Sequence, residues 1–226
     1  MKRKSNKFEK PGKIELRILF LVTCFLFTSK LFAADEWLLI KSENEIQIYL
    51  KQQKNSPLKE SKGVVKVKVP LHNLVQLLLD NNSATKWMHN MAQYKVVKQL
   101  SDTEKFTYTV VDFPWPTHDR DCLVHSRIWQ DSSNGKGTIA LSGQTEYNQE
   151  NSSYVRMKKF QGSWQFTLLE NGYVEVVYQV STDPGGDIPP WMVNLQIIEI
   201  PCYTLRNLKR MVKDEKYNVR PDWLKK

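Results

Sequence analysis

The chain has 226 residues, enough for one domain of about 190 residues behind a leader, and a domain of that size can bury a sizeable core. Its 33 Lys and Arg against 24 Asp and Glu give a net charge of +9, which would suit a nucleic-acid-binding protein. Residues 1–33 hold eight of the basic and two of the acidic residues, which leaves 25 against 22, a net charge of only +3, for the rest. Because a nucleic-acid binder concentrates positive charge on its folded domain, this distribution argues against nucleic acid as a partner.

Residues 1–33 have the form of a signal peptide or an N-terminal anchor. A basic stretch runs to Arg17, an apolar stretch follows over 18–27, and a cleavage site fits after Ala33. A spanning helix needs about 20 apolar residues, so this shorter stretch, followed by Lys30, favours a cleaved signal over an uncleaved inner-membrane anchor. We therefore expect an exported, periplasmic protein whose folded domain covers residues 34–226.

The first part of that domain predicts strands followed by helices. Alternating polar and apolar residues are typical of half-buried strands, and in residues 63–69 Val65, Val67 and Val69 face one way while the lysines between them face the other. Pro70 can open a helix, in which leucines recur at spacings of three and four. The expected elements are a short helix over 36–40 packed through Trp37, strands over 45–50 and 63–69, and helices over 71–80 and 84–88.

The second part predicts an antiparallel meander and one long helix. Alternation with a period of two continues from Gln93, and polar turns separate candidate strands over 93–99, 104–112, 120–130, 137–147, 154–168 and 173–182. A turn at 183–186 leads to a helix over 189–216, which Pro201 should kink near Ile197. The order of elements favours an α+β fold, in which a curved antiparallel sheet is covered on one face by a long C-terminal helix.

Three stretches of this chain resemble the START lipid-transfer family. Residues 113–121 (FPWPTHDRD) are similar to the family's Pro-aromatic-Pro pattern before an Arg-Asp pair. Residues 162–178 resemble its Gly-Trp strand and the strand that follows. Residues 183–194 (DPGGDIPPWMVN) match the family's entry into its last helix. The likeness spans about residues 36–215 and depends on the order and spacing of the three motifs.

The resemblance implies a helix-grip fold of the START and Bet v 1 type, with a cavity for one ligand between the sheet and the last helix. It implies non-catalytic binding of a lipid or sterol-like molecule, for transfer or for sensing, and transient contact with a membrane surface. We expect a monomer. The candidate cavity and lid residues are Tyr108, Trp115, Arg120, Cys122, Val124, Trp164, Tyr178, Trp191, Leu195 and Ile198, of which the three tryptophans could equally be plain core.

One departure from the family concerns charge inside the cavity. Members often carry a buried Arg six residues after the Arg of the Arg-Asp pair, and counting from Arg120 that position is Ser126, with Arg127 one residue further on. A shift of one residue moves a side chain to the other face of a strand. Either a bulge returns Arg127 to the inside or the cavity lacks this charge, and the second is favoured because bulges are exceptions.

The sequence offers no catalytic residues, no metal ligands and no cofactor motif. The four histidines are scattered, and neither a Ser nor a Cys nucleophile lies in an activating context. Behind the leader, Cys122 and Cys202 fit buried free thiols better than a disulfide or a metal site. The alternative to lipid binding is an enzyme on the same fold, a cyclase or hydrolase acting on a hydrophobic substrate, which would need titratable groups facing the cavity.

Overall fold

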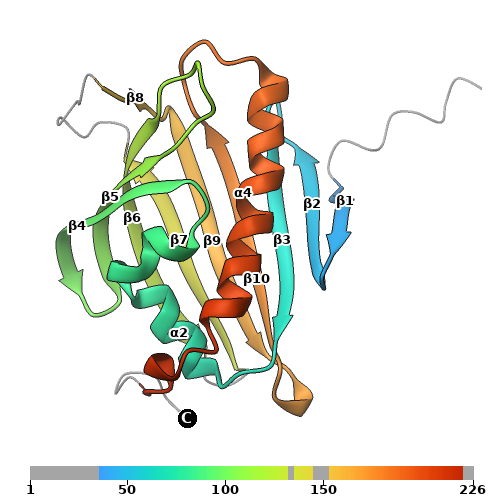
Figure 1. The fold of residues 1–226 in the computed structure, drawn as a ribbon, viewed down its shortest axis with the longest axis vertical. Helices are drawn as coiled ribbons and strands as arrows, with labels where there is room; N and C mark the ends of the chain where they lie inside the picture. The colour runs from blue at the N-terminus through green and yellow to red at the C-terminus, as the bar shows by residue number, and fades with distance from the viewer. Residues whose placement is uncertain (1–35, 132–134, 145–152, 221–226) are drawn as a thin grey trace, which may run out of the picture. The chain divides into compact units, whose positions relative to one another are not determined.

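The computed structural model describes residues 36–131, 135–144 and 153–220 (Figure 1). The expected leader, residues 1–33, lies outside the described residues. The strands are β1 (Leu38–Glu43), β2 (Ile46–Gln52), β3 (Lys59–Val67), β4 (Met91–Ser101), β5 (Glu104–Val111), β6 (Arg120–Asp131), β7 (Lys136–Gln144), β8 (Val155–Arg156), β9 (Lys159–Leu168) and β10 (Val174–Asp183). The helices are α2 (Leu71–Leu79), α3 (Ala84–Trp87) and α4 (Pro190–Met211), with single 3₁₀ turns η1 (Asn81–Ser83), η2 (Glu170–Gly172) and η3 (Glu215–Tyr217).

The described strands form one antiparallel sheet in the order β1-β2-β3-β10-β9-β7-β6-β5-β4, with the short β8 paired in parallel to the start of β6. Strand β10 lies between β3 and β9, which joins the first strands of the domain to the meander. Helix α4 lies across one face of this curved sheet, and α2 lies at the lower end of the sheet in this view (Figure 1). This arrangement confirms the predicted α+β helix-grip fold.

The predicted helix over 36–40 is wrong, since residues 38–43 form the edge strand β1. Asn44 and Glu45 both have positive φ (52° and 65°), the conformation of a two-residue hairpin turn, and they fold β1 back along β2. Strand β1 is mostly exposed on both faces. Its side chains therefore show no alternation from which a strand could have been recognised. Trp37 packs on the outer face of the sheet, with its ring centroid 4.6 Å from the Lys62 Nζ.

Strand β3 and helix α2 follow their sequence patterns. Val65 and Val67 are almost completely buried, while Lys66 and Lys68 are exposed, as the alternation predicts. Pro70 precedes the first residue of α2, and the leucines and valine on one side of that helix are buried in the core. Each such side chain contributes about 1.5–3 kcal/mol through burial, so this helix is held mainly by its apolar face.

Aromatic and aliphatic side chains fill part of the space between the sheet and the helices. Trp164 of β9 stacks on Tyr178 of β10 with ring centroids 4.0 Å apart, and it meets Trp87 of α3 edge-on at 5.7 Å. Cys202, Leu205 and Leu208 of α4 pack into the same core as α2 and β3. The C-terminal half of α4 is thereby fixed to the sheet by a conventional hydrophobic core.

Two predicted elements are longer than the observed ones. The strand expected over 154–168 is interrupted at residues 157–158, where the chain passes from β8 to β9. Helix α4 ends at Met211, and η3 follows, with the Tyr217 hydroxyl donating to Asp80 over 2.9 Å. Pro201 lies inside α4, which continues past it to Met211. The kink near Ile197 remains a prediction.

Candidate functional site

A cavity of about 230 Å³ lies between the concave face of the sheet and α4. A single water needs only on the order of 10–15 Å³, so this is a ligand-sized space and not a packing defect. Most of its wall is apolar, and its polar side chains are few and come from particular strands, as is usual for sites that take small hydrophobic molecules. Its apolar lining includes Met88, Val124, Ile139, Leu141, Met157, Phe160, Trp164, Val193 and Ile197.

Four of the ten predicted site residues line this cavity: Cys122, Val124, Trp164 and Tyr178. Cys122 and Val124 are alternate residues of β6, so they share its inner face. Trp164 and Tyr178 are directly opposite one another on β9 and β10, which brings both rings to the same place. Burial raises the pKa of the Tyr178 hydroxyl, which therefore stays neutral in the cavity wall.

Tyr108 does not line the cavity, because it lies on the outer face of β5. Its hydroxyl donates to Asp121 Oδ2 over 2.8 Å, and Arg156 donates to the same carboxylate through Nε at 2.8 Å and Nη2 at 3.0 Å. Burial, followed by the Asp121 hydrogen bond, raises the pKa of Tyr108, and the same carboxylate raises the pKa of Arg156. These hydrogen bonds link β8 to β5 and β6 on the outer face of the sheet.

Arg120 is 2% exposed, yet it does not line the cavity. Its guanidinium donates to the carbonyl oxygens of Pro184 at 3.4 Å and Gly185 at 3.2 Å, and also to that of His118. The turn that it holds needs glycine, since Gly185 and Gly186 have φ of +65° and +68°. Arg120 therefore ties the β5–β6 loop to the segment that leads into α4, and Asp121 faces the other way, as expected for adjacent strand residues.

The three predicted site residues on α4, Trp191, Leu195 and Ile198, do not line the cavity. The residues of α4 that line the cavity are Val193, Gln196, Ile197, Ile200, Pro201 and Thr204. Trp191 is 66% exposed, Leu195 is 45% exposed, and Ile198 packs against the hydrophobic core beside the cavity. The prediction failed because the apolar arc of α4 is wide: one side packs on β2 and β3, and the side facing the cavity includes polar Gln196 and Thr204.

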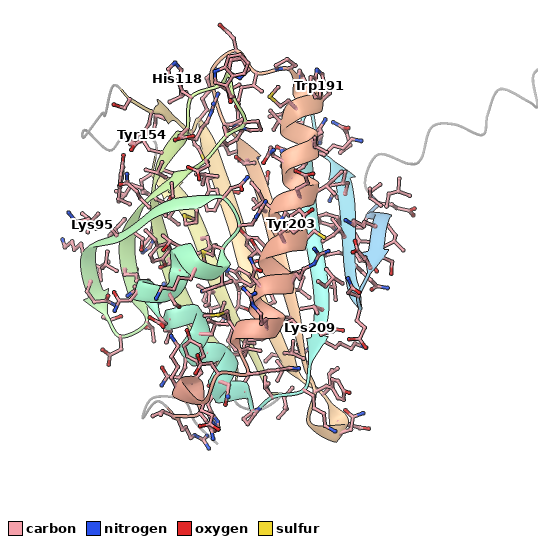
Figure 2. The ribbon with its side chains drawn as sticks, viewed as in Figure 1. Lys95, His118, Tyr154, Trp191, Tyr203 and Lys209 are labelled. Carbon is pink, nitrogen blue, oxygen red and sulfur yellow. The ribbon has the colours of Figure 1, made fainter. Side chains whose placement is uncertain are left out.

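Two exposed tryptophans mark one end of the domain. Trp115, in the β5–β6 loop, is 91% exposed, and Trp191 stands at the end of α4 shown uppermost in Figure 2. Each is two residues from a residue that lines the cavity, Phe113 in one case and Val193 in the other. The Arg120 hydrogen bonds join the two loops that carry them. The predicted residues Trp115 and Trp191 therefore lie beside the cavity and not within its wall.

The side chain at the family's arginine position is Ser126, which is 7% exposed and lines the cavity, whereas Arg127 is exposed on the outer face. No bulge interrupts the pairing of β5 with β6, so successive side chains of β6 keep alternating between the two faces of the sheet. The cavity therefore lacks that arginine, as expected.

A different cationic side chain, that of Lys105, does line the cavity, and the sequence analysis did not predict it. Lys105 of β5 is directly opposite Ser126 of β6 and is 7% exposed. Its Nζ donates to Asn81 Oδ1 and lies 5.7 Å from the centroid of the Tyr94 ring. Burial lowers the pKa of Lys105 to about 8, which still leaves it mostly protonated at neutral pH. Pairing the two candidate strands in the sequence could have found Lys105, because residues directly opposite one another in an antiparallel pair point to the same face of the sheet.

Burial also shifts the pKa of two other titratable groups in the wall, Cys122 and His89. Burial raises the pKa of the Cys122 thiol to about 11, so it is not a thiolate nucleophile at neutral pH. Burial lowers the pKa of His89, whose ring stacks beside Tyr203. Cys122 and Cys202 are free and buried. Within the described ranges, no group of His, Cys, Asp and Glu is arranged to hold a metal ion, and no helix is long and apolar enough to span a bilayer.

Comparison with known proteins gives a consistent match. Residues 22–200 fit the family model described as START domain. The uncharacterized protein PA1579 of Pseudomonas aeruginosa is 32% identical over 176 residues, which is 78% of this chain and 86% of that protein. Human phosphatidylcholine transfer protein is 25% identical over 180 residues, 77% of this chain and 83% of that protein.

Solved structures agree with these matches. The crystal structure of a STAR-related lipid transfer protein fragment from Xanthomonas axonopodis superposes with a TM-score of 0.73 at 30% identity, covering 80% of this chain and 100% of that one. Human STARD10 superposes with a TM-score of 0.71 at 17% identity, covering 93% and 83%, and this second likeness shows the fold alone.

Proposed function

The chain belongs to the START domain family, and we propose that it binds one lipid or sterol-like molecule in its cavity, for transfer between membranes or for sensing. The observation that carries this proposal is the ligand-sized space between the sheet and α4, beside a well-packed hydrophobic core. Relatives named as lipid transfer proteins, from human and from Xanthomonas axonopodis, support it.

Such a cavity has a physical task. Moving one hydrocarbon chain of about 15 methylenes into water costs about 12 kcal/mol, which makes unassisted exchange of lipids between membranes slow. A dry wall of leucine, isoleucine, methionine and aromatic side chains receives the chain without that cost. The cavity needs no chemistry for this task, and a neutral Cys122 and a single buried amine do not compose an acid–base pair. We therefore propose a binding protein and not an enzyme.

A transfer assay tests the proposal directly. Purified protein is added to donor vesicles that carry a self-quenched fluorescent phospholipid and to unlabelled acceptor vesicles. We expect the rate of transfer to increase in proportion to protein concentration. Binding of the labelled lipid without faster transfer would favour sensing. The absence of both binding and transfer, with a panel that includes a sterol and a fatty acid, would contradict the proposed function.

We propose that the end carrying Trp115 and Trp191 contacts the membrane during loading. Tryptophan prefers the interfacial region of bilayers, and side chains that are 91% and 66% exposed can enter it without unfolding the domain. Because each lies two residues from the cavity wall, contact there would place the cavity against the lipid surface.

Replacing both residues, Trp115→Ala with Trp191→Ala, is expected to slow vesicle transfer about tenfold while the melting temperature stays within a few degrees of the parent, since little buried area is lost. Trp129→Ala is the matched control, because Trp129 is 51% exposed on the outer face of β6, away from the cavity wall. Equal transfer rates for the double variant and the control would contradict the membrane-contact proposal.

We also propose that the domain acts outside the cytoplasm, because residues 1–33 have the pattern of a secretory signal. Intact-mass analysis of the exported protein tests this: a mass that begins at residue 34 supports a cleaved signal, and a full-length mass in the membrane fraction would support the anchor instead.

A further inference from the structure

The cavity contains one buried cation without an anionic partner. Among the described residues, no ion pair joins Lys105 to a carboxylate, and its one hydrogen-bond acceptor is the neutral Asn81. Glu104, its neighbour, also borders the cavity, but its carboxylate lies 2.7 Å from His125 Nε2 on β6 and is engaged there. Asp102, which also lines the cavity, lies exposed in the β4–β5 turn.

An unpaired ammonium group is costly to bury, and proteins rarely retain one in an otherwise apolar wall. Burial alone depresses the pKa of Lys105, with no neighbouring anion to raise it. The surroundings are nevertheless suited to an anion, because Ser126 and Asn81 line the same part of the cavity and can hydrogen-bond a ligand oxygen. What is missing from this cluster is a negative charge.

We propose that Lys105 binds the anionic group of the ligand, a phosphate or a carboxylate, so that the cargo is an anionic amphiphile and not a neutral lipid. This inference rests on the proposed function and narrows it to a ligand class. Lys105 lies near the β4–β5 turn, and β5 runs from there to the loop that carries Trp115, about 20 Å along the strand. The head group therefore lies deep in the cavity, and the hydrocarbon chain extends towards the tryptophan end.

The cationic side chain here comes from β5, the strand next to β6, which was expected to carry it. Ser126 occupies the position where the START resemblance implied an arginine, and Lys105 faces it from β5. The cavity thus keeps a positive charge at this level although Arg127 is outside.

The test compares ligands that share hydrocarbon chains and differ in charge. Delipidated full-length protein is titrated with palmitate and with hexadecanol, and with phosphatidate and the matching diacylglycerol. We expect the parent to bind the anionic member of each pair at least about tenfold more tightly. Lys105→Met should lose that preference and keep its affinity for the neutral ligands, while Lys105→Arg should retain it. Lys95→Met, on the exposed strand β4, is the control (Figure 2).

The possible results of these titrations distinguish the role of Lys105 from the proposed function. Equal affinity of the parent for charged and neutral ligands, or an unchanged preference in Lys105→Met, would overturn the role of Lys105 and leave the proposed function standing. Failure of the parent to bind any of the four ligands, or a sterol added as a fifth, would contradict the proposed function itself. Inorganic phosphate that binds as tightly as phosphatidate would overturn the lipid head-group assignment, because the site would then serve a free anion.

Discussion

Replacing Lys105 with methionine is expected to raise the free energy of unfolding of the delipidated protein by about 2–3 kcal/mol at neutral pH. The physical reason is the cost of burying an ammonium group without a counter-charge, and a fall in the pKa of Lys105 from 10.5 to about 8 corresponds to a destabilisation of about 3 kcal/mol. Methionine has a similar length and no charge, so the cavity wall keeps its volume. Urea unfolding followed by tryptophan fluorescence measures the difference.

The pH dependence of the free energy of unfolding provides a second test of this prediction. The unfolded chain holds its proton up to about pH 10.5 while the native protein releases it near pH 8, so the parent gains stability as pH rises between these values. The advantage of Lys105→Met should therefore be largest below pH 8 and vanish above about pH 10.5. Lys95→Met, which removes an exposed charge, should show neither effect. A destabilised Lys105→Met variant at pH 7 would contradict the account.

Replacing Arg156 with methionine is expected to lower the free energy of unfolding by about 3 kcal/mol, because it leaves the Asp121 carboxylate buried with one partner. Asp121 is 1% exposed, and among the described residues Arg156 donates two hydrogen bonds to its carboxylate, at 2.8 and 3.0 Å, and Tyr108 a third. The Tyr108 hydroxyl alone cannot balance the charge. Chemical unfolding of the variant measures the loss.

The double variant Asp121→Leu with Arg156→Met is the control for this network. Removing both charges avoids the uncompensated carboxylate, so we expect the double variant to be more stable than Arg156→Met alone. Arg206→Met, which removes an exposed pairing with Glu43, should cost less than about 1 kcal/mol. A loss of similar size in Arg156→Met and Arg206→Met would contradict the buried network as a source of stability.

The fold could be predicted from the sequence because its signals are local. Alternation located the meander, the spacing of leucines located α2, and the motif at residues 183–194 located the start of α4. Strand β1 could not be predicted, since an edge strand exposed on both faces carries no periodic signal. The difference is physical: burial on one face produces a pattern, and exposure on both faces does not.

The cavity wall could be predicted only in part, for a related reason. In β5, Tyr108 was predicted to line the cavity, yet its hydroxyl binds Asp121 on the outer face, where Phe106 of the same strand stacks on His125. The inner face carries Lys105, Thr107 and Thr109. A strand that lines the polar part of a cavity has its pattern inverted, and hydrophobicity alone assigns it to the wrong side. On α4, the same rule selected Trp191 and Leu195, which are exposed, and Ile198, which packs against the core beside the cavity.

Native mass spectrometry of the protein purified under gentle conditions, followed by extraction of what it carries, is the most direct measurement. The account predicts a single bound amphiphile per chain, bearing a phosphate or carboxylate, and loss of that species from Lys105→Met. A protein that remains empty after exposure to membranes containing anionic lipids would contradict it.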